Sequence, residues 1–113
     1  MDAPGDGHGR GAGGGRGAGP VRFDGDQVHQ GDVLVVRVLS PSLASELPGL
    51  AGLVSETGST LSHLAIVARE LGVPTAVAVP DATHRFHAGQ MIVVDGRTGE
   101  VAPVDTSMEV ITR

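Results

Sequence analysis

Short apolar runs recur along the chain from residue 33 onward, separated by glycine, proline and acidic residues. The uninterrupted run from Val33 to Leu39 predicts a strand that is buried on most of both faces. Further strands are expected at Leu50 to Ser55, Thr75 to Val79, Met91 to Val94 and near Glu100 to Val104. A short helical turn is expected at Ser42 to Leu47, and the turn at Asp95 to Gly99 connects the last two strands.

One segment has helical periodicity instead, and it predicts a helix over residues 59–71. The apolar residues that recur at helical spacing are Leu61, Leu64, Ala65, Ala68 and Leu71. Ser59 or Thr60 is expected to be the N-cap, and Gly72 with Pro74 ends the helix. The alternation of strands and helices predicts one small α/β domain in which helices pack against a sheet.

The N-terminal residues differ in composition from the rest of the chain. Residues 1–20 contain nine of the 18 glycines and almost no large apolar side chain. Such a segment buries too little surface to offset the entropy of ordering its backbone. We therefore expect a disordered Gly-rich tail at 1–20 and a folded domain at 21–113, and removal of the tail should leave the melting temperature unchanged.

Charge and composition exclude several classes of function. Arginines and aspartates balance in the tail, so the net charge of −5 belongs to the predicted domain and argues against nucleic-acid and anionic-membrane partners. With no apolar run long enough to span a bilayer and no signal peptide, the expected location is cytoplasmic. The absence of cysteine excludes disulfides and thiolate metal sites. The absence of lysine excludes a Walker-type phosphate loop and Schiff-base chemistry from this chain alone.

His63 is the candidate catalytic residue, because a Gly/Ser/Thr turn places it in the first turns of the predicted helix. Helix N-terminal amides and the helix dipole favour an anion at this position, and a neutral imidazole is a good phosphoryl acceptor. The residues expected to support a phosphate are Gly58, Ser59, Thr60 and Ser62. If the helix includes them, Ser59 and Thr60 share a face with His63. Arg69 projects from another side of the helix and is expected to contact a partner.

Structural explanations compete with each functional one. A histidine in the first turn of a helix is often only a capping or half-buried residue. His84 and His87 have metal-ligand spacing but lie in a predicted polar loop, so no metal site is expected. A hydrolase triad built on Ser59 or Ser62 is improbable because no nucleophile-elbow motif is present. Asp81 and Asp95 are interpreted as solvated turn residues.

The segment from Thr57 to Pro74 resembles the phosphorylated-histidine segment of the phosphoenolpyruvate-utilising enzymes, a family that includes pyruvate phosphate dikinase, phosphoenolpyruvate synthase and rifampin phosphotransferase. The matching positions are His63, Ala65 to Glu70, Gly72 and Pro74. Ser59, Leu61 and Leu64 depart from the usual pattern, and the Leu61-Ser62-His63 sequence is closer to the rifampin-phosphotransferase-like members. The resemblance implies a compact β/β/α phosphohistidine swivelling (mobile) domain.

The resemblance also implies a function as a phosphotransferase component. His63 would accept a phosphoryl group at one active site and donate it at another. The expected partners are an ATP-grasp nucleotide-binding domain or protein and a phosphoenolpyruvate-binding barrel or other acceptor domain. Mg²⁺ and ATP or phosphoenolpyruvate would be bound by those partners, with no cofactor bound by this chain alone. The alternative is a non-catalytic interaction or regulatory module with the same fold, for which Leu61 and Leu64 would be signs of relaxed constraint.

Overall fold

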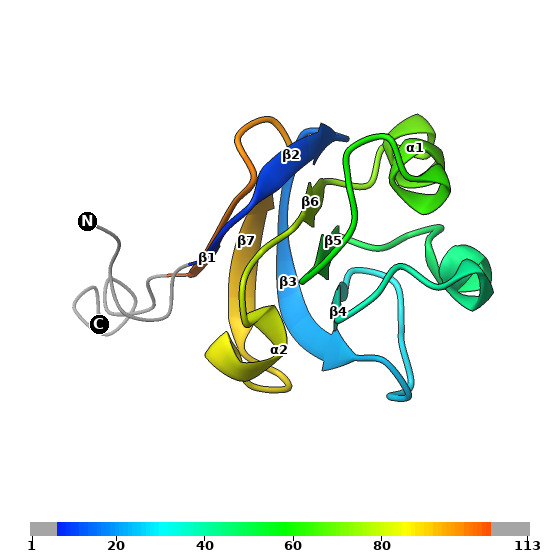
Figure 1. The fold of residues 1–113 in the computed structure, drawn as a ribbon. Coiled ribbons are helices and arrows are strands. Elements are labelled where there is room, and N and C mark those ends of the chain that lie inside the picture. Colours follow the sequence, from blue (N-terminus) through cyan, green and yellow to red (C-terminus); the bar gives the residue numbers. More distant parts are fainter. Residues whose placement is uncertain (1–6, 105–113) are drawn as a thin grey trace.

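An eight-stranded sheet is the centre of residues 7–104, the part of the chain that the computed structural model describes (Figure 1). The strands are β1 (Gly7–His8), β2 (Arg10–Gly13), β3 (Arg16–Phe23), β4 (Val33–Val36), β5 (Gly52–Ser55), β6 (Thr75–Val77), β7 (Met91–Asp95) and β8 (Glu100–Pro103). The helices are α1 (His63–Glu70), α2 (Ala82–Arg85) and the 3₁₀ helix η1 (Pro41–Glu46). The predicted mixed α/β fold is therefore confirmed.

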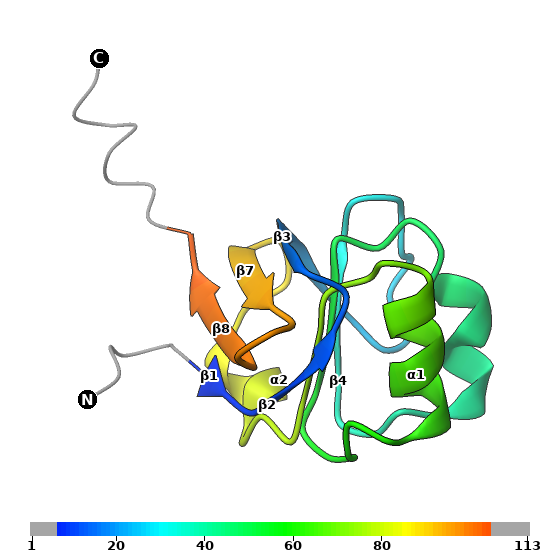
Figure 2. The ribbon, with the colours of Figure 1, turned by 90° about the horizontal axis from the view of Figure 1, so that it is seen from above.

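The order of the strands is β1-β8-β7-β3-β4-β5-β6-β2. Strands β3 to β6 are parallel, and the other neighbours are antiparallel. Only Gly9 separates β1 from β2 in the chain, yet these two strands lie at opposite ends of the strand order. The sheet therefore curls so that its two ends meet at the N-terminal segment (Figure 2). The Gly9 amide donates to the Gly99 carbonyl (2.9 Å), which ties this junction to the β7–β8 turn.

Two apolar cores lie on the two sides of the parallel strands. In β4, Val33 and Val35 belong to a core that includes Phe86 and Ile92, whereas Leu34 and Val36 face the core beneath α1 and η1. Alternate residues of a strand point to opposite faces, so a strand in which every residue is buried must lie between two layers. The valine-rich run thus forms a central strand, and the layers follow the order strand, strand, helix (Figure 2).

The prediction of a disordered tail through residue 20 is wrong for residues 7–20, which form β1, β2 and the first part of β3. The glycines of this segment permit close approach of backbones. A Cβ atom at Gly17 would lie 2.2 Å from the Ala51 carbonyl oxygen, and one at Gly19 would lie 2.0 Å from that of Gly31. The predicted domain therefore begins by residue 7 rather than at 21, while residues 1–6 and 105–113 lie outside the described part.

Two further predictions need correction. Helix α1 begins at His63 instead of residue 59, because Ser62 is still extended and acts as the N-cap in place of Ser59 or Thr60. Residues Ala82–Arg85 form the short helix α2, where a polar loop was expected, because the buried Ala82 and the nearby Phe86 pack against the sheet. Within residues 7–104 no helix has the length and apolar character needed to cross a bilayer.

Close backbone packing at Gly19 can be tested by adding one methyl group. Gly19→Ala should lower the free energy of unfolding by about 1–3 kcal/mol, because the new Cβ forces β3 away from the Gly31 carbonyl. Urea unfolding followed by circular dichroism measures the change. Ala18→Ser, on the exposed side of the same strand, is the control and should change stability by less than about 0.5 kcal/mol. Equal stability of the two variants would contradict the packing.

Candidate functional site

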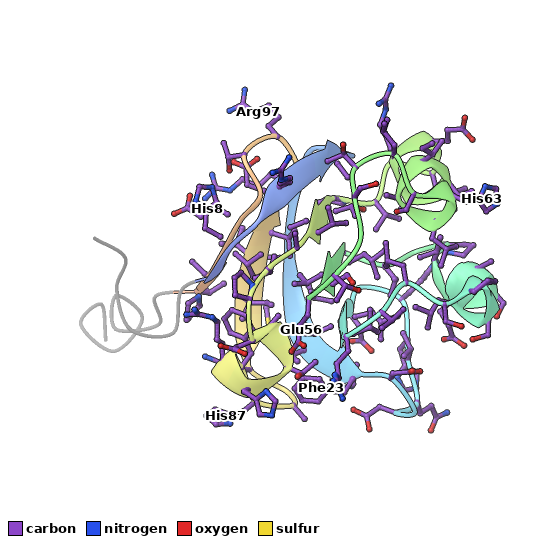
Figure 3. All side chains as sticks on the ribbon, viewed as in Figure 1. His8, Phe23, Glu56, His63, His87 and Arg97 are labelled. Carbon is purple, nitrogen blue, oxygen red and sulfur yellow. The ribbon has the colours of Figure 1, made fainter. Side chains whose placement is uncertain are left out.

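The candidate site is the connection between β5 and α1, which ends at His63. His63 is the first residue of α1 and is exposed. Figure 3 shows its ring on the outer side of α1, directed away from the sheet, and far from the labelled His8 and His87. The fold thus presents the imidazole at the surface, where a second protein can reach it.

The start of this connection is fixed to the neighbouring strands. The Thr57 hydroxyl donates to the Arg37 carbonyl (2.8 Å), and the Glu56 amide donates to the Val36 carbonyl (3.0 Å). On the other side, the Val79 amide donates to the Ser55 carbonyl (3.0 Å). These bonds continue the sheet pairing for a short distance beyond β5, so the chain leaves the sheet at a defined point.

Gly58 precedes the turn at Thr60 and Leu61. Its φ of +99° lies in the left-handed region, which a residue with a side chain adopts only at a cost. The turn that follows is closed by serine side chains. The Ser59 hydroxyl oxygen accepts from the Leu61 amide (3.2 Å), and the Ser62 hydroxyl donates to the Ser59 carbonyl (2.9 Å). The predicted role of Gly58 in shaping the turn agrees with this geometry.

The beginning of α1 leaves backbone donors beside His63. The Ile66 amide donates to the Ser62 carbonyl (3.0 Å), and this is the first bond of the helical ladder. The amides of His63, Leu64 and Ala65 precede that bond and have no acceptor within the helix. The Ser62 side chain does not cap them. An anion next to His63 would therefore meet amide hydrogens and the positive end of the helix dipole.

The structure arranges the predicted supporting residues differently from the predicted helix. Because α1 begins at His63, Ser59 and Thr60 lie in the preceding turn and do not share a helical face with the imidazole. Arg69 is exposed in the last turn of α1, and its aliphatic part lies against Gly13 of β2. The arginine thus extends toward β2, in keeping with a surface contact.

The sequence reasoning missed Glu56, which ties the same connection to α2. One carboxylate oxygen accepts hydrogen bonds from the Thr83 hydroxyl (2.5 Å) and the Thr83 amide (2.8 Å), and the other lies 3.8 Å from Arg37 Nε. The hydroxyl bond is the main cause that lowers the pKa of Glu56, followed by the amide bond, while partial burial opposes them. The only signal in the sequence was an acidic residue directly after a buried strand.

The other candidate residues do not gather into a second site. His84 lies on α2, and its Nδ1 is 3.4 Å from the Thr83 hydroxyl, whereas His87 follows that helix and is exposed. Across residues 7–104, no group of three or more histidine, aspartate or glutamate side chains could hold a metal ion. Asp95 accepts hydrogen bonds from the Arg97 and Thr98 amides, as expected of a turn residue.

Residues 28–99, well over half of the chain, match the family described as "PEP-utilising enzyme, mobile domain". The chain belongs to this family. The mobile domain is 40% identical over 76 residues to phosphoenolpyruvate synthase of Pyrococcus furiosus, an alignment that covers 67% of this chain and 9% of the relative. It is 42% identical over 71 residues to rifampicin phosphotransferase of Streptomyces sviceus, covering 63% of this chain and 8% of the relative.

A solved structure agrees with this assignment. The solution structure of Enzyme I (nEIt) superposes on the mobile domain with a TM-score of 0.61 and 29% identity, covering 76% of this chain and 36% of that one. The family resemblance inferred from the residues around His63 is therefore confirmed. The chain spans about a tenth of the length of the curated relatives that it matches.

The contribution of Glu56 to the mobile domain should depend on pH. Glu56→Gln should lower the free energy of unfolding at pH 7 by about 1–2 kcal/mol, because a neutral amide accepts the two Thr83 bonds less strongly. The folded-state pKa lies below the ordinary value near 4.5, so the carboxylate stabilises the fold above that value. The stabilisation is lost as the pH falls through the folded-state pKa, and the two proteins should then converge.

Urea unfolding at pH 7 and at acid pH measures this difference. The matched control is Glu46→Gln, because Glu46 is exposed and forms no ion pair with any residue in the described range 7–104. A loss of stability for Glu56→Gln that is the same at both pH values would show that its charge is unimportant.

Proposed function

We propose that the domain carries a phosphoryl group on His63 between active sites on partner domains or subunits. The supporting observation is the exposed imidazole at the start of α1, next to the amides of His63, Leu64 and Ala65. Exposure gives access to a donor and an acceptor in turn, and the amides stabilise the added negative charge.

Both transfers are displacements at phosphorus. In the first, the lone pair of a neutral ring nitrogen of His63 forms the N–P bond while the bond from phosphorus to the donor's leaving oxygen breaks, and that oxygen keeps the electron pair. In the second, an oxygen of the acceptor forms a new bond to phosphorus, the N–P bond breaks, and its electron pair returns to the ring nitrogen. The imidazole is thereby regenerated without any net oxidation or reduction.

Hydroxyl groups of the preceding turn complete the proposed phosphate environment. Ser59 Oγ accepts from the Leu61 amide, so its own hydrogen is available to a phosphoryl oxygen. Thr60 offers a second hydroxyl from the same turn. The Ser62 hydroxyl donates to the Ser59 carbonyl and would have to change partner to contribute. Gly58 shapes the turn that presents these groups.

Partner domains supply the remaining chemistry in this proposal. Transfer to and from His63 needs Mg²⁺ and cationic groups around the moving phosphoryl, together with ATP or phosphoenolpyruvate. We assign these to an ATP-grasp domain and to a phosphoenolpyruvate-binding barrel or other acceptor domain, with Arg69 as a docking contact. Such an exchange is expected in the cytoplasm. The match to a mobile domain supports this assignment of the remaining chemistry to other domains, since each relative is more than ten times as long as the matched segment.

The proposal predicts an acid-labile phosphoryl adduct on His63. The protein is incubated in a lysate of its host with either ATP or phosphoenolpyruvate, and intact mass and site mapping are measured at neutral to alkaline pH. His63→Ala should lose the adduct completely and remain folded, because the side chain is exposed. His87→Ala, also exposed but distant in Figure 3, is the matched control and should keep it.

An adduct that survives in His63→Ala would show that another residue accepts the phosphoryl group. No adduct on the unaltered protein with either donor would favour a non-catalytic module instead.

A second prediction separates the effect of the turn's shape on phosphorylation of His63 from the effect of a general loss of stability. Gly58→Ala and Gly72→Ala each place a methyl group on a residue with positive φ, +99° and +76°, so each should cost about 1 kcal/mol of stability. Only Gly58→Ala should slow phosphorylation of His63, by at least about threefold, because it displaces the turn before the imidazole. Equal phosphorylation rates in the two variants would contradict the proposed positioning by Gly58.

A further inference from the structure

A pocket with two arginines lies beside the connection that carries His63. Its volume is about 400 Å³, and the side chains that line it include those of Thr60, Leu61, Arg69 and Arg97. Residues 11–13 of β2 also line the pocket. Figure 2 shows β2 running between α1 and the β7–β8 turn. The N-terminal segment therefore contributes to a surface pocket next to the connection that carries His63.

Glycines of β2 make the pocket possible. A Cβ at Gly13 would lie 2.7 Å from Arg69 Cδ, and a Cβ at Gly11 would lie 2.6 Å from the Arg97 carbonyl carbon. Any side chain at these two positions would therefore press on the residues that form the pocket, while Ala12 between them is buried. Gly11 and Gly13 therefore leave this stretch of β2 without side chains on the side that faces the pocket.

The pocket carries two positive charges that form no close ion pair. None of its described lining residues is acidic, and within residues 7–104 no carboxylate oxygen lies within 4.0 Å of the Arg69 or Arg97 guanidinium nitrogens. Asp95, in the same turn, has its pKa lowered mainly by the hydrogen bond from the Arg97 amide and also by the charge of Arg97, so it balances part of that charge at longer range, whereas Arg69 has no such carboxylate among the lining residues. A negatively charged group of a partner fits this pocket.

The exposure of Leu61 favours a protein over a small anion as the occupant of the pocket. Leu61 is 81% exposed, the largest value among the exposed large apolar side chains in the described part of the chain. A free anion would neutralise the arginines and leave this leucine in water. A protein surface that pairs an acidic side chain with apolar neighbours would cover both.

We propose that this pocket is the docking site for an acidic, leucine-flanked segment of the domain that exchanges the phosphoryl group with His63. The proposal rests on the proposed function for the identity of the partner. His63 points outward from the other side of α1 (Figure 3), so the pocket anchors the partner while the imidazole remains free to react. Arg69, expected from the sequence to be a docking residue, acts here together with Arg97.

The first experiment requires no phosphoryl transfer, so its outcome is independent of the proposed function. The ¹⁵N-labelled full chain is titrated with the end-capped peptide ELDLE, its uncharged counterpart QLNLQ and inorganic phosphate, and amide chemical shifts are recorded. ELDLE should shift the signals of Gly11, Thr60 and Leu61 in a saturable way. Arg97→Glu and Arg69→Glu should each weaken its binding about three- to tenfold. Arg16→Glu, a charge reversal at another exposed arginine, on β3, should change it less than twofold.

A further variant tests the pocket independently, in case the charge-reversal variants do not fold. Leu61→Ser alters a side chain that is almost wholly in solvent, so it should fold normally and still weaken ELDLE binding about twofold or more. The proposal is overturned if ELDLE produces no saturable shifts, if QLNLQ binds equally well, or if phosphate alone binds at the same residues with equal affinity. The last result would indicate a small-anion site.

Phosphorylation kinetics then test whether the pocket binds the partner that phosphorylates His63. With the donor that phosphorylates His63, Arg97→Glu should raise the domain concentration for half-maximal phosphorylation about three- to tenfold and leave the maximal rate unchanged. His63→Ala abolishes the reaction at every concentration, which separates loss of docking from loss of chemistry. An unchanged half-maximal concentration in Arg97→Glu would show that the pocket does not bind the phosphoryl-exchanging domain.

Discussion

The close approach of backbone to backbone in the N-terminal segment is the constraint on which the rest of the structure depends. β1 and β2 occupy the two ends of the strand order although only Gly9 separates them, so the sheet can form only if its ends come together. Side chains at Gly17 and Gly19 would collide with carbonyl oxygens of neighbouring loops. The entropy that glycine loses on ordering is offset here by hydrogen bonds and contacts that other residues would exclude.

The parallel pairing of β4 with β5 determines where the connection to the candidate site begins. The central strands β4 and β5 are buried throughout, and their carboxyl ends leave the sheet side by side. Thr57 and Glu56 bind to the backbone beyond β4 and to Thr83 of α2, respectively. The connection to His63 therefore begins from a fixed base, so the movement that the proposed function requires would take place between domains instead of within this loop.

The sequence predicted the parts of this molecule in which side chains determine the structure. Valine-rich runs identified the central strands, and the spacing from Thr57 to Pro74 identified His63 and the family. The sequence did not predict the N-terminal strands. Glycines contribute nothing to a hydrophobic pattern, and their packing depends on backbone atoms distant in sequence, such as the Gly31 carbonyl. The sequence prediction also began α1 too early, since local bonds of Ser59 and Ser62 compete with the first helical turn. The sequence did not indicate a role for Glu56 or Arg97, because the residues around them in the fold are remote in sequence.

The separation of charge from the imidazole suits a carrier. A phosphoryl group on His63 would face backbone amides and hydroxyls, whereas the Arg69 side chain extends toward β2 and Arg97 lies in the β7–β8 turn. A guanidinium bound tightly to the phosphoryl group would stabilise the carried state and slow its release to the next acceptor. In the proposed function, amide dipoles would stabilise the anion more weakly and leave the cationic contacts to the active sites of the partner domains. The proposed docking pocket, on the other side of α1 from the imidazole, would then strengthen docking without stabilising the phosphorylated state of His63.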